Sequence, residues 1–314
     1  MKQIVSYHDT FLISSEADVL NELEYKVGKA IPQVPEIERN TFGFTTENMC
    51  ITGLGLYNQG LESLPSAFFE LTRLSEANLS LNEFKELPEA FGDLIGLKKL
   101  NLGGNYLNSL PDSFYKLQNL EKLDLESNLL KSLPTSFYQL VNLKTLNLAG
   151  NHLRDLPESF SQLIHLQILN LRSNQLEVLS ESFGQLTNLV ELELQRNNLR
   201  ALPDSIGNLI KLEKLGLGIN QLQALPNSFG FLVNLQQLNL NENQLAALPD
   251  SFYQLIKLQE LSLDWNPLRF LSEEVGNFRN LKTLSLRNTP IAIFEAERIK
   301  IEHLLKECAI RWKF

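Results

Sequence analysis

Cysteine is scarce in this sequence, which contains only Cys50 and Cys308 in 314 residues. The disulfide clusters that usually close both ends of extracellular repeat proteins are therefore missing, and this favours a reducing compartment. Near the N-terminus the only apolar run is residues 11–13, which is shorter than a secretory signal requires. No stretch has the length of a membrane span. We therefore expect a cytoplasmic protein without a membrane partner.

Positive charge is also in short supply. The 28 Lys and Arg residues are outnumbered by 37 Asp and Glu residues, and the formal net charge is -9. Nucleic acids and anionic lipids are bound through clusters of Lys and Arg, and the sequence has no basic block of this kind. We therefore expect no nucleic-acid partner.

Residues that typically carry catalysis are few and scattered. The four histidines are His8, His152, His165 and His303. None of them has a Cys or a second His at metal-ligand spacing. Gly103 and Gly104 come nearest to a phosphate-binding motif, but no lysine-bearing helix follows them. Cys308 is expected on the apolar stripe of a terminal helix, which favours a buried, inert thiol over a nucleophile. We expect no enzyme activity, no metal and no cofactor.

What the sequence has in abundance is a repeat of 23 residues. The pattern L-x-x-L-x-L-x-x-N-x-L-x-x-L-P-x-x-F-x-x-L-x-x begins at Leu97, recurs at this step up to Leu281, and extends backward to Ile51. This gives eleven repeats over residues 51–291 without an insertion. A single repeat cannot bury its own Leu and Phe side chains. The repeats must therefore stack around one continuous core.

Each repeat predicts a strand, a bend and a short helical turn. Leucines that alternate with polar residues, such as Leu123 and Leu125, indicate a strand with one buried face. The Asn that follows can donate and accept hydrogen bonds along a ladder of neighbouring repeats. In the second half, Leu and Phe have helical spacing, and Pro is placed to open a helical or 3-10 turn. The ladder residues are Asn82, Asn105, Asn128, Asn151, Asn174, Asn197, Asn220, Asn243 and Asn266, with Gln59 and Thr289 in their place at the two ends.

These features resemble the leucine-rich-repeat family over residues 51 to about 291. The motif L-P-x-x-F-x-x-L in a 23-residue repeat is similar to the intracellular subtype of Ras-suppressor and Scribble-type scaffolds, and of many bacterial and archaeal proteins. The resemblance implies an α/β fold, a right-handed solenoid or horseshoe. A parallel β-sheet would line its concave face, helical or 3-10 turns its convex face, and caps would close its ends.

Residues 1–50 are predicted to form the N-terminal cap, since they lie outside the repeat. Ser14 and Ser15 are expected to N-cap a helix that ends at Gly28. Residues 42–45 and 49–54 are expected to form the two strands of a hairpin that leads into the first repeat.

Residues 292–314 are predicted to form the C-terminal cap. A helix from residue 293 to about residue 310 is expected to cover the last leucine layer. The side chains expected to pack there are Ile299, Leu304, Leu305 and Cys308, with Trp312 and Phe314 closing the end.

The predicted binding surface lies on the concave sheet, at the fifth, seventh and eighth positions of each repeat. These positions are bland at Gly103, Gly104, Ala149 and Gly150, and richer in the second half of the chain. Trp and Arg are the types most enriched in binding hot spots. Two alternatives stay open: Trp265 shields the edge of the Asn ladder, and the charged residues form a balanced, solvated face. The predicted partner-binding residues are Glu126, Arg172, Glu193, Gln195, Arg196, Asn241, Glu242, Asp264, Trp265 and Arg287.

Three classes of function follow from this reading. The first is a cytoplasmic, monomeric, non-catalytic scaffold or adaptor that binds a protein partner, and the resemblance to Ras-suppressor repeats implies a small GTPase as one candidate. The second is an effector, secreted without a signal peptide, that inhibits a target protein by occlusion. The third is an enzyme, which would require a catalytic domain beyond this sequence.

Overall fold

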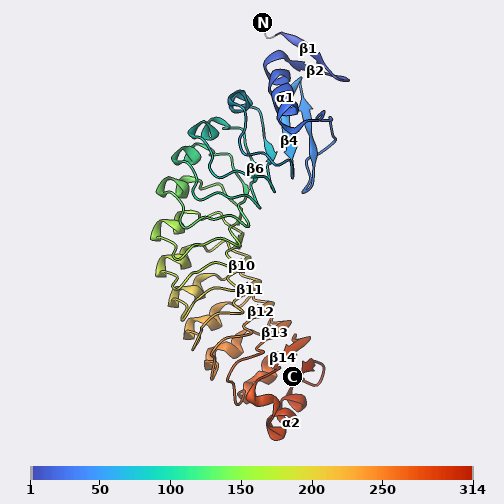
Figure 1. Cartoon of the computed structure of the whole chain (residues 1–314). Helices are drawn as coiled ribbons and strands as arrows, with labels where there is room; N and C mark the ends of the chain where they lie inside the picture. Colours follow the sequence, from blue (N-terminus) through green and yellow to red (C-terminus); the bar gives the residue numbers. More distant parts are fainter. Residues whose placement is uncertain (1–2, 313–314) are drawn as a thin grey trace. The chain divides into compact units, whose positions relative to one another are not determined.

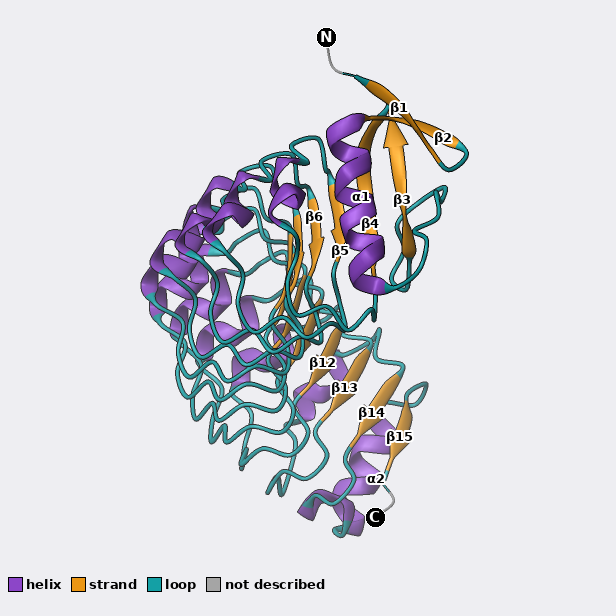
Figure 2. Ribbon diagram, turned by 45° about the horizontal axis from the view of Figure 1, so that its top comes forward, coloured by secondary structure: helices purple, strands orange, loops and turns teal. Residues whose placement is uncertain are grey.

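The computed structural model describes residues 3–312 and comprises two compact units, Met1–Asn151 and His152–Phe314. Each unit is built of stacked repeats that alternate a short strand with a 3-10 helix (Figures 1 and 2). In each unit the strands lie side by side on one side and the 3-10 helices on another (Figure 2). This is the solenoid architecture that the repeat predicts.

The first unit begins with an antiparallel hairpin of β1 (Ile4–Tyr7) and β2 (Thr10–Ile13), followed by helix α1 (Ser14–Val27). A second antiparallel hairpin, β3 (Phe42–Glu47) and β4 (Cys50–Leu56), starts the main sheet. Four parallel strands continue it in chain order: β5 (Glu76–Asn78), β6 (Lys99–Asn101), β7 (Lys122–Asp124) and β8 (Thr145–Asn147). The 3-10 helices are η1 (Ser66–Glu70), η2 (Glu89–Asp93), η3 (Asp112–Lys116) and η4 (Thr135–Gln139).

Over residues 152–312 the second unit has seven parallel strands, also paired in chain order. They are β9 (Ile168–Asn170), β10 (Glu191–Glu193), β11 (Lys214–Gly216), β12 (Gln237–Asn239), β13 (Glu260–Ser262), β14 (Thr283–Ser285) and β15 (Ala309–Arg311). Its 3-10 helices are η5 (Glu158–Gln162), η6 (Glu181–Gln185), η7 (Asp204–Asn208), η8 (Asn227–Phe231), η9 (Asp250–Gln254), η10 (Glu273–Asn277) and η11 (Pro290–Ala292). Helix α2 (Glu295–Leu304) lies between η11 and β15.

The core of each unit is the stacked leucine and phenylalanine layer predicted from the repeat. In β11, Leu215 is buried, and so is Leu217 just beyond the strand. Phenylalanines of neighbouring 3-10 helices stack face to face, with ring centroids 5.7 Å apart for Phe91 and Phe114. No repeat could bury these side chains alone, so stability comes from the contacts between neighbours.

In most repeats a proline occupies the N-cap position, immediately before the 3-10 helix. Pro88 has φ -71° and ψ 159°, and its carbonyl accepts a hydrogen bond from the N–H of Phe91 at 2.9 Å. Proline fits this position because its fixed φ suits the extended conformation and no partner for its missing N–H is needed. Ser180 adopts the same conformation without Pro, so the repeat geometry does not depend on the ring.

The predicted Asn ladder is confirmed. Asn197 donates from Nδ2 to the carbonyl of Leu194 in its own repeat and to that of Leu171 in the preceding repeat, both at 3.0 Å. Its Oδ1 accepts the N–H of Leu176 at 3.0 Å. One buried amide therefore satisfies three backbone groups across two repeats.

At the two ends of the Asn ladder, Gln59 and Thr289 occupy the position of the Asn. The N–H of Gln59 donates to Oδ1 of Asn82 at 3.0 Å, so the first repeat receives a ladder bond without supplying an Asn. Thr289 donates from Oγ1 to the carbonyl of Leu286 at 2.6 Å, in place of the corresponding Asn amide. The shorter hydroxyl satisfies the carbonyl of its own repeat.

The N-terminal cap departs from its prediction at the start of α1. The helix begins at Ser14 with Ile13 as N-cap residue, and no side chain caps it, so the expected capping by Ser14 and Ser15 is wrong. The N–H of Ser14 donates instead to the carbonyl of Gln3 at 2.8 Å. The β1–β2 hairpin, which the sequence did not indicate, thus replaces a side-chain cap. The end at Gly28 is confirmed, since this residue has φ 73°.

The predicted hairpin of the cap is confirmed, with longer strands than expected. β3 and β4 extend over residues 42–47 and 50–56 and enclose a turn at Asn48 and Met49, both with positive φ. The outer edge of β3 is covered, because the N–H of Phe44 donates to the carbonyl of Pro32 at 2.9 Å. This contact protects the sheet at its N-terminal end.

The C-terminal cap is only partly helical. α2 ends at Leu304, where the N–H of Leu305 bonds to Ile301, and the expected helical continuation to residue 310 is wrong. Residues 309–311 form β15 instead, beginning with the N–H of Ala309, which donates to the carbonyl of Lys282 at 2.8 Å. Pairing with β14 satisfies backbone groups of that strand that a longer helix would leave without partners.

The residues that close the last core layer also differ from the expected ones. Ile299 is 60% exposed, whereas Ile301 is fully buried and Leu305 nearly so. Cys308 lies beyond the helix and is half-buried, and this burial raises the pKa of its thiol. Of the two expected closing residues, Trp312 donates from Nε1 to Glu302, and Phe314 lies outside the described residues.

Candidate functional site

The outward face of the sheet carries the polar side chains predicted to bind a partner. Positions five, seven and eight point outward as expected, and so does position three. In β11, for example, Lys214 is exposed beside the buried Leu215. Position three was missed, although the alternation itself signals it: when position four points inward, positions three and five both point outward.

Nine of the ten predicted residues belong to the second unit, and Glu126 belongs to the first. Six of the ten are exposed: Glu126, Arg172, Arg196, Glu242, Trp265 and Arg287. Four are half-buried: Glu193, Gln195, Asn241 and Asp264. Trp265 is 59% exposed, which favours a binding role over the alternative of shielding the Asn ladder.

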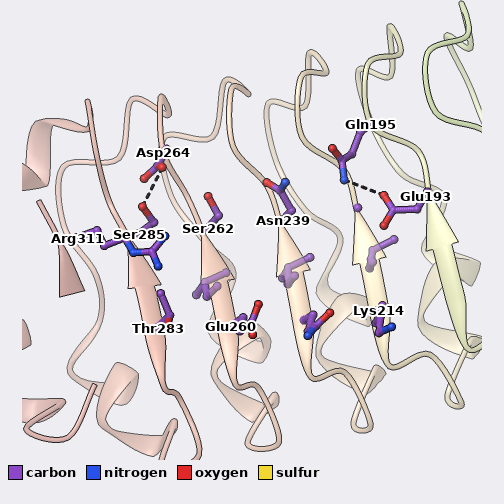
Figure 3. A pocket seen from close by; sticks show the side chains of 15 residues that line it. Glu193, Gln195, Lys214, Asn239, Glu260, Ser262, Asp264, Thr283, Ser285 and Arg311 are labelled. Carbon is purple, nitrogen blue, oxygen red and sulfur yellow. Dashed lines mark hydrogen bonds between the residues drawn. The ribbon is translucent and has the colours of Figure 1, made fainter. Parts of the chain in front are cut away.

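A hollow of about 400 Å³ opens on the sheet face of the second unit (Figure 3). It follows the fifth position of successive repeats, from Glu193 on β10 at one end to Arg311 on β15 at the other (Figure 3). Between these ends lie Gly216, Asn239, Ser262 and Ser285, each paired with the next in the sheet. We call this row of six residues the polar trough.

Two glycines stand on the outward face of the repeat that contains β11, and one of them, Gly216, belongs to the polar trough. A Cβ atom on Gly216 would collide with the carboxylate of Glu193, and one on Gly218 would collide with the amide of Asn241. The side chains of the neighbouring repeats therefore lean over positions where this repeat has none.

The carboxylate of Glu193 lies in the trough and is partly removed from solvent. Its Oε2 accepts a hydrogen bond from Nε2 of Gln195 at 2.8 Å (Figure 3). Burial raises the pKa of Glu193 above its usual value, although the Gln195 amide and the charge of Arg172 act in the opposite direction. Arg172 acts on Glu193 through its charge alone, since within residues 3–312 neither Arg172 nor Arg196 forms a salt bridge.

Other charges beside the trough are already engaged. Lys214 Nζ lies 2.7 Å from Oε1 of Glu191, one repeat earlier. Asp264 accepts hydrogen bonds from Oγ of Ser285 at 2.8 Å and from the N–H of Arg287 at 2.7 Å, the first of which is drawn in Figure 3. These residues shape the walls, while the charges at the two ends stay available.

Sequence reasoning missed three charged residues of this surface. Lys214 and Glu260 stand at position three, which was left out of the outward set. Arg311 lies just beyond the helix expected to about residue 310, and its place in the trough exists only because β15 extends the sheet. No local pattern in residues 309–311 could have revealed this, since the strand depends on a partner strand distant in the chain.

A smaller hollow, of about 180 Å³, lies on the sheet face of the first unit. Glu126 and Asp124 line it together with Gly103 and Gly104. Burial raises the pKa of Asp124, whose Oδ1 accepts the N–H of Glu126 at 2.9 Å. The two glycines that made this stretch look bland are thus what opens the hollow.

Side chains that bind metal ions are not clustered in the part of the chain that the structure describes. Among residues 3–312, no three or more His, Cys, Asp and Glu side chains are placed to hold a metal ion. Over the same range, no helix combines the length and the apolar character needed to cross a bilayer.

Comparison with known proteins identifies the family. The family model described as "Leucine rich repeat" matches residues 95–153 and 210–268, and the one described as "Leucine-rich repeat region" matches residues 137–220. A solved leucine-rich-repeat protein of Leptospira interrogans is 32% identical, with a TM-score of 0.60 over 82% of this chain and 83% of that chain. The chain belongs to the leucine-rich-repeat family.

Two further solved structures are similar to this leucine-rich-repeat protein. An internalin of Listeria monocytogenes shares the fold, with a TM-score of 0.66 and 20% identity over 94% of this chain and 88% of that chain. A chain of the Toll–Spätzle complex of Drosophila has a TM-score of 0.64 and 26% identity over 76% of this chain, but only 37% of that chain is covered. A search of curated proteins found no match. The intracellular subtype stays a prediction.

Proposed function

We propose that this leucine-rich-repeat protein is a non-catalytic interaction scaffold whose protein partner docks on the outward sheet face of its second unit. The observation that carries the proposal is the polar trough, with Glu193 partly desolvated at one end and the exposed Trp265 beside it. The Toll chain, which has the same fold, is found in a complex with Spätzle, and this supports a protein as the partner class.

Energetics favour binding over a purely structural role for this surface. A carboxylate whose pKa is raised by burial destabilises the folded state at neutral pH, and such groups are concentrated at functional sites. Trp265 and Arg196 are of the residue types that dominate the binding energy of interfaces. Both are exposed on the outward face of the second unit.

The test is quantitative capture of proteins from lysate of the source cells, with the full chain as bait. Trp265→Ala and Arg196→Ala are expected to reduce capture of the same partner at least tenfold, since each removes a hot-spot side chain. Phe231→Ala is the matched control, because Phe231 lies on η8 and is 58% exposed, close to the 59% of Trp265. Loss of capture with Phe231→Ala alone would place the partner on the opposite side and overturn the proposal.

The same capture experiment distinguishes between the more specific proposals for the partner. A small GTPase partner, proposed by resemblance to Ras-suppressor repeats, would be enriched together with bound guanine nucleotide. The occluding effector would instead be recovered from the culture medium, attached to the enzyme that it inhibits. We propose the cytoplasmic scaffold as the leading form, and fractionation of the source cells tests the location. Light scattering of the purified chain tests the expected monomer.

A further inference from the structure

We propose that the polar trough binds an extended peptide segment of the partner, with a basic side chain at one end of the segment and a carboxylate at the other. This inference rests on the proposed function, because it specifies which chemistry the sheet face recognises. The six residues of the trough set the length, the polarity and the charge of the segment.

The length follows from the strand spacing. Glu193 on β10 and Arg311 on β15 are separated by five strand-to-strand steps. At about 4.8 Å for each step, the two ends are on the order of 24 Å apart. An extended chain rises about 3.4 Å for each residue, so about seven residues reach from one end to the other.

The charges at the two ends of the trough determine the direction in which the peptide segment binds. Glu193 uses Oε2 to accept the Gln195 amide, and within residues 3–312 no salt bridge neutralises its carboxylate. Arg311 likewise forms no salt bridge within residues 3–312, and its guanidinium is exposed. A basic side chain complements Glu193, and a carboxylate, from a side chain or a chain terminus, complements Arg311 with bidentate geometry.

The middle of the trough suits a peptide backbone. At Gly216 the side-chain ends of Glu193 and Gln195 cover the strand. Ser262 presents a short hydroxyl group, whereas the buried hydroxyl of Ser285 is bonded to Asp264. Asn239 accepts the N–H of Asn241 with Oδ1 at 3.0 Å, and among the described residues its amide nitrogen donates to no partner. This nitrogen can donate to a peptide carbonyl. The opposite charges at the ends disfavour a polyanion such as nucleic acid.

Selection from a phage-displayed library of random heptapeptides, with the full chain immobilised, tests the inference. Wild type is expected to enrich peptides with Lys or Arg at one end and Asp or Glu at the other. Glu193→Gln is expected to abolish the basic preference alone, and Arg311→Gln the acidic preference alone. Glu177→Gln and Arg269→Gln, both at exposed positions outside the trough, are the matched controls. No enrichment, or enrichment that both trough variants leave unchanged, overturns the inference.

A second variant closes the trough without removing a charge. Gly216→Asn gives this repeat the residue that the next repeat has in Asn239, and the clash it creates involves the flexible ends of Glu193 and Gln195. We expect at least tenfold weaker binding of a selected peptide, measured by fluorescence polarisation, with an unchanged far-UV spectrum. Undiminished binding would show that the trough is not the site.

Failure of this inference is distinguishable from failure of the proposed function. If partner capture is lost in Trp265→Ala but unaffected by Gly216→Asn, and no heptapeptide is selected, the partner docks on the face without a peptide in the trough. The proposed function then stands and the peptide inference falls. If capture is insensitive to both variants, both proposals fall.

Discussion

The asparagine that recurs at the end of each strand is the residue with the largest structural role in this protein. Asn197 is 6% exposed, and the three backbone groups that it satisfies belong to buried leucines. A hydrophobic side chain could fill the same space but would leave those groups without partners. Each buried, unsatisfied group costs about 1–3 kcal/mol.

We expect Asn197→Ala to lower the free energy of unfolding by about 3 kcal/mol, because two carbonyls and one N–H lose their partner. Urea denaturation followed by circular dichroism measures the change. Asn198→Ala is the control, since Asn198 is adjacent and exposed. Equal effects of the two substitutions would mean that the ladder contributes no more than a surface amide.

Glu24 joins three parts of the N-terminal cap. Its Oε1 accepts hydrogen bonds from Oη of Tyr7 and the N–H of Ile31, both at 2.6 Å, and lies 3.0 Å from Nε2 of His8. Partial burial alone would raise the pKa of Glu24, but these hydrogen bonds and the charge of His8 outweigh it and hold the pKa below its usual value. Burial, together with the hydrogen bond to Glu24 and the charge of that carboxylate, raises the pKa of Tyr7.

Because its folded-state pKa is lowered, Glu24 stabilises the cap above its unfolded-state pKa, and this contribution is lost as pH falls through the folded-state pKa. We expect Glu24→Gln to lower the melting temperature at pH 7, and the difference from wild type to shrink in acid, where wild-type Glu24 is protonated. Thermal melts at pH 7 and below the folded-state pKa provide the measurement. Glu22→Gln, on the exposed side of α1, should change neither. A difference independent of pH would contradict the role of the charge.

Among the elements, the 3-10 helices pack so closely that several repeats require glycine. A Cβ atom on Gly230 of η8 would collide with the carbonyl of Ser251 in η9. Gly276 stands at the corresponding position of η10, where the nearest atom to such a Cβ would be Leu304 Cδ2 at 3.5 Å. The same sequence position is therefore crowded between repeats and relaxed beneath the cap.

Gly230→Ala is expected to destabilise the protein by about 1–3 kcal/mol, because η8 and η9 must move apart. Gly276→Ala should be neutral or slightly stabilising, since alanine reduces the entropy of the unfolded chain. The midpoints of urea denaturation of the two variants measure this difference in stability. Equal midpoints would show that the 3-10 layer absorbs a methyl group without strain.

Repeating elements could be read from the sequence, and the caps only in part. The strand and the 3-10 turn of each repeat were predicted because their side chains recur in one environment. β1, β2 and β15 were not, because each is stabilised by a partner strand and lacks its own periodic signal. The helix expected to about residue 310 included Ala309 and Ile310, which pair with β14 instead.

For the whole chain, stability is expected to be a sum over neighbouring repeats, since each contacts those beside it. Deletion of one complete repeat, residues 212–234, should leave a folded protein, because Asn243 would then offer its amide where Asn220 does now. Deletion of residues 212–233, one residue fewer, should abolish cooperative unfolding, since the shift turns inward side chains outward. Circular dichroism and urea titration test both. Equivalent behaviour of the two deletions would contradict a fixed register.

The sequence predicted which face of the sheet carries the candidate site, but it did not predict the polar trough. The repeat register placed Glu193, Asp264 and Trp265 on the outward face, because alternation along a strand is a local property. The position of the Glu193 side chain over Gly216 and the role of Arg311 depend on neighbours 23 or more residues away.

By itself, the sequence determined the repeat, its register, the leucine core and the Asn ladder, because a periodic chain offers the same local solution many times. Tertiary structure alone decided how the ends are closed and which charges share one trough. Those outcomes depend on contacts between distant segments, whose energies no local pattern encodes. The surface proposed to bind a partner is one of the features that only the tertiary structure decided.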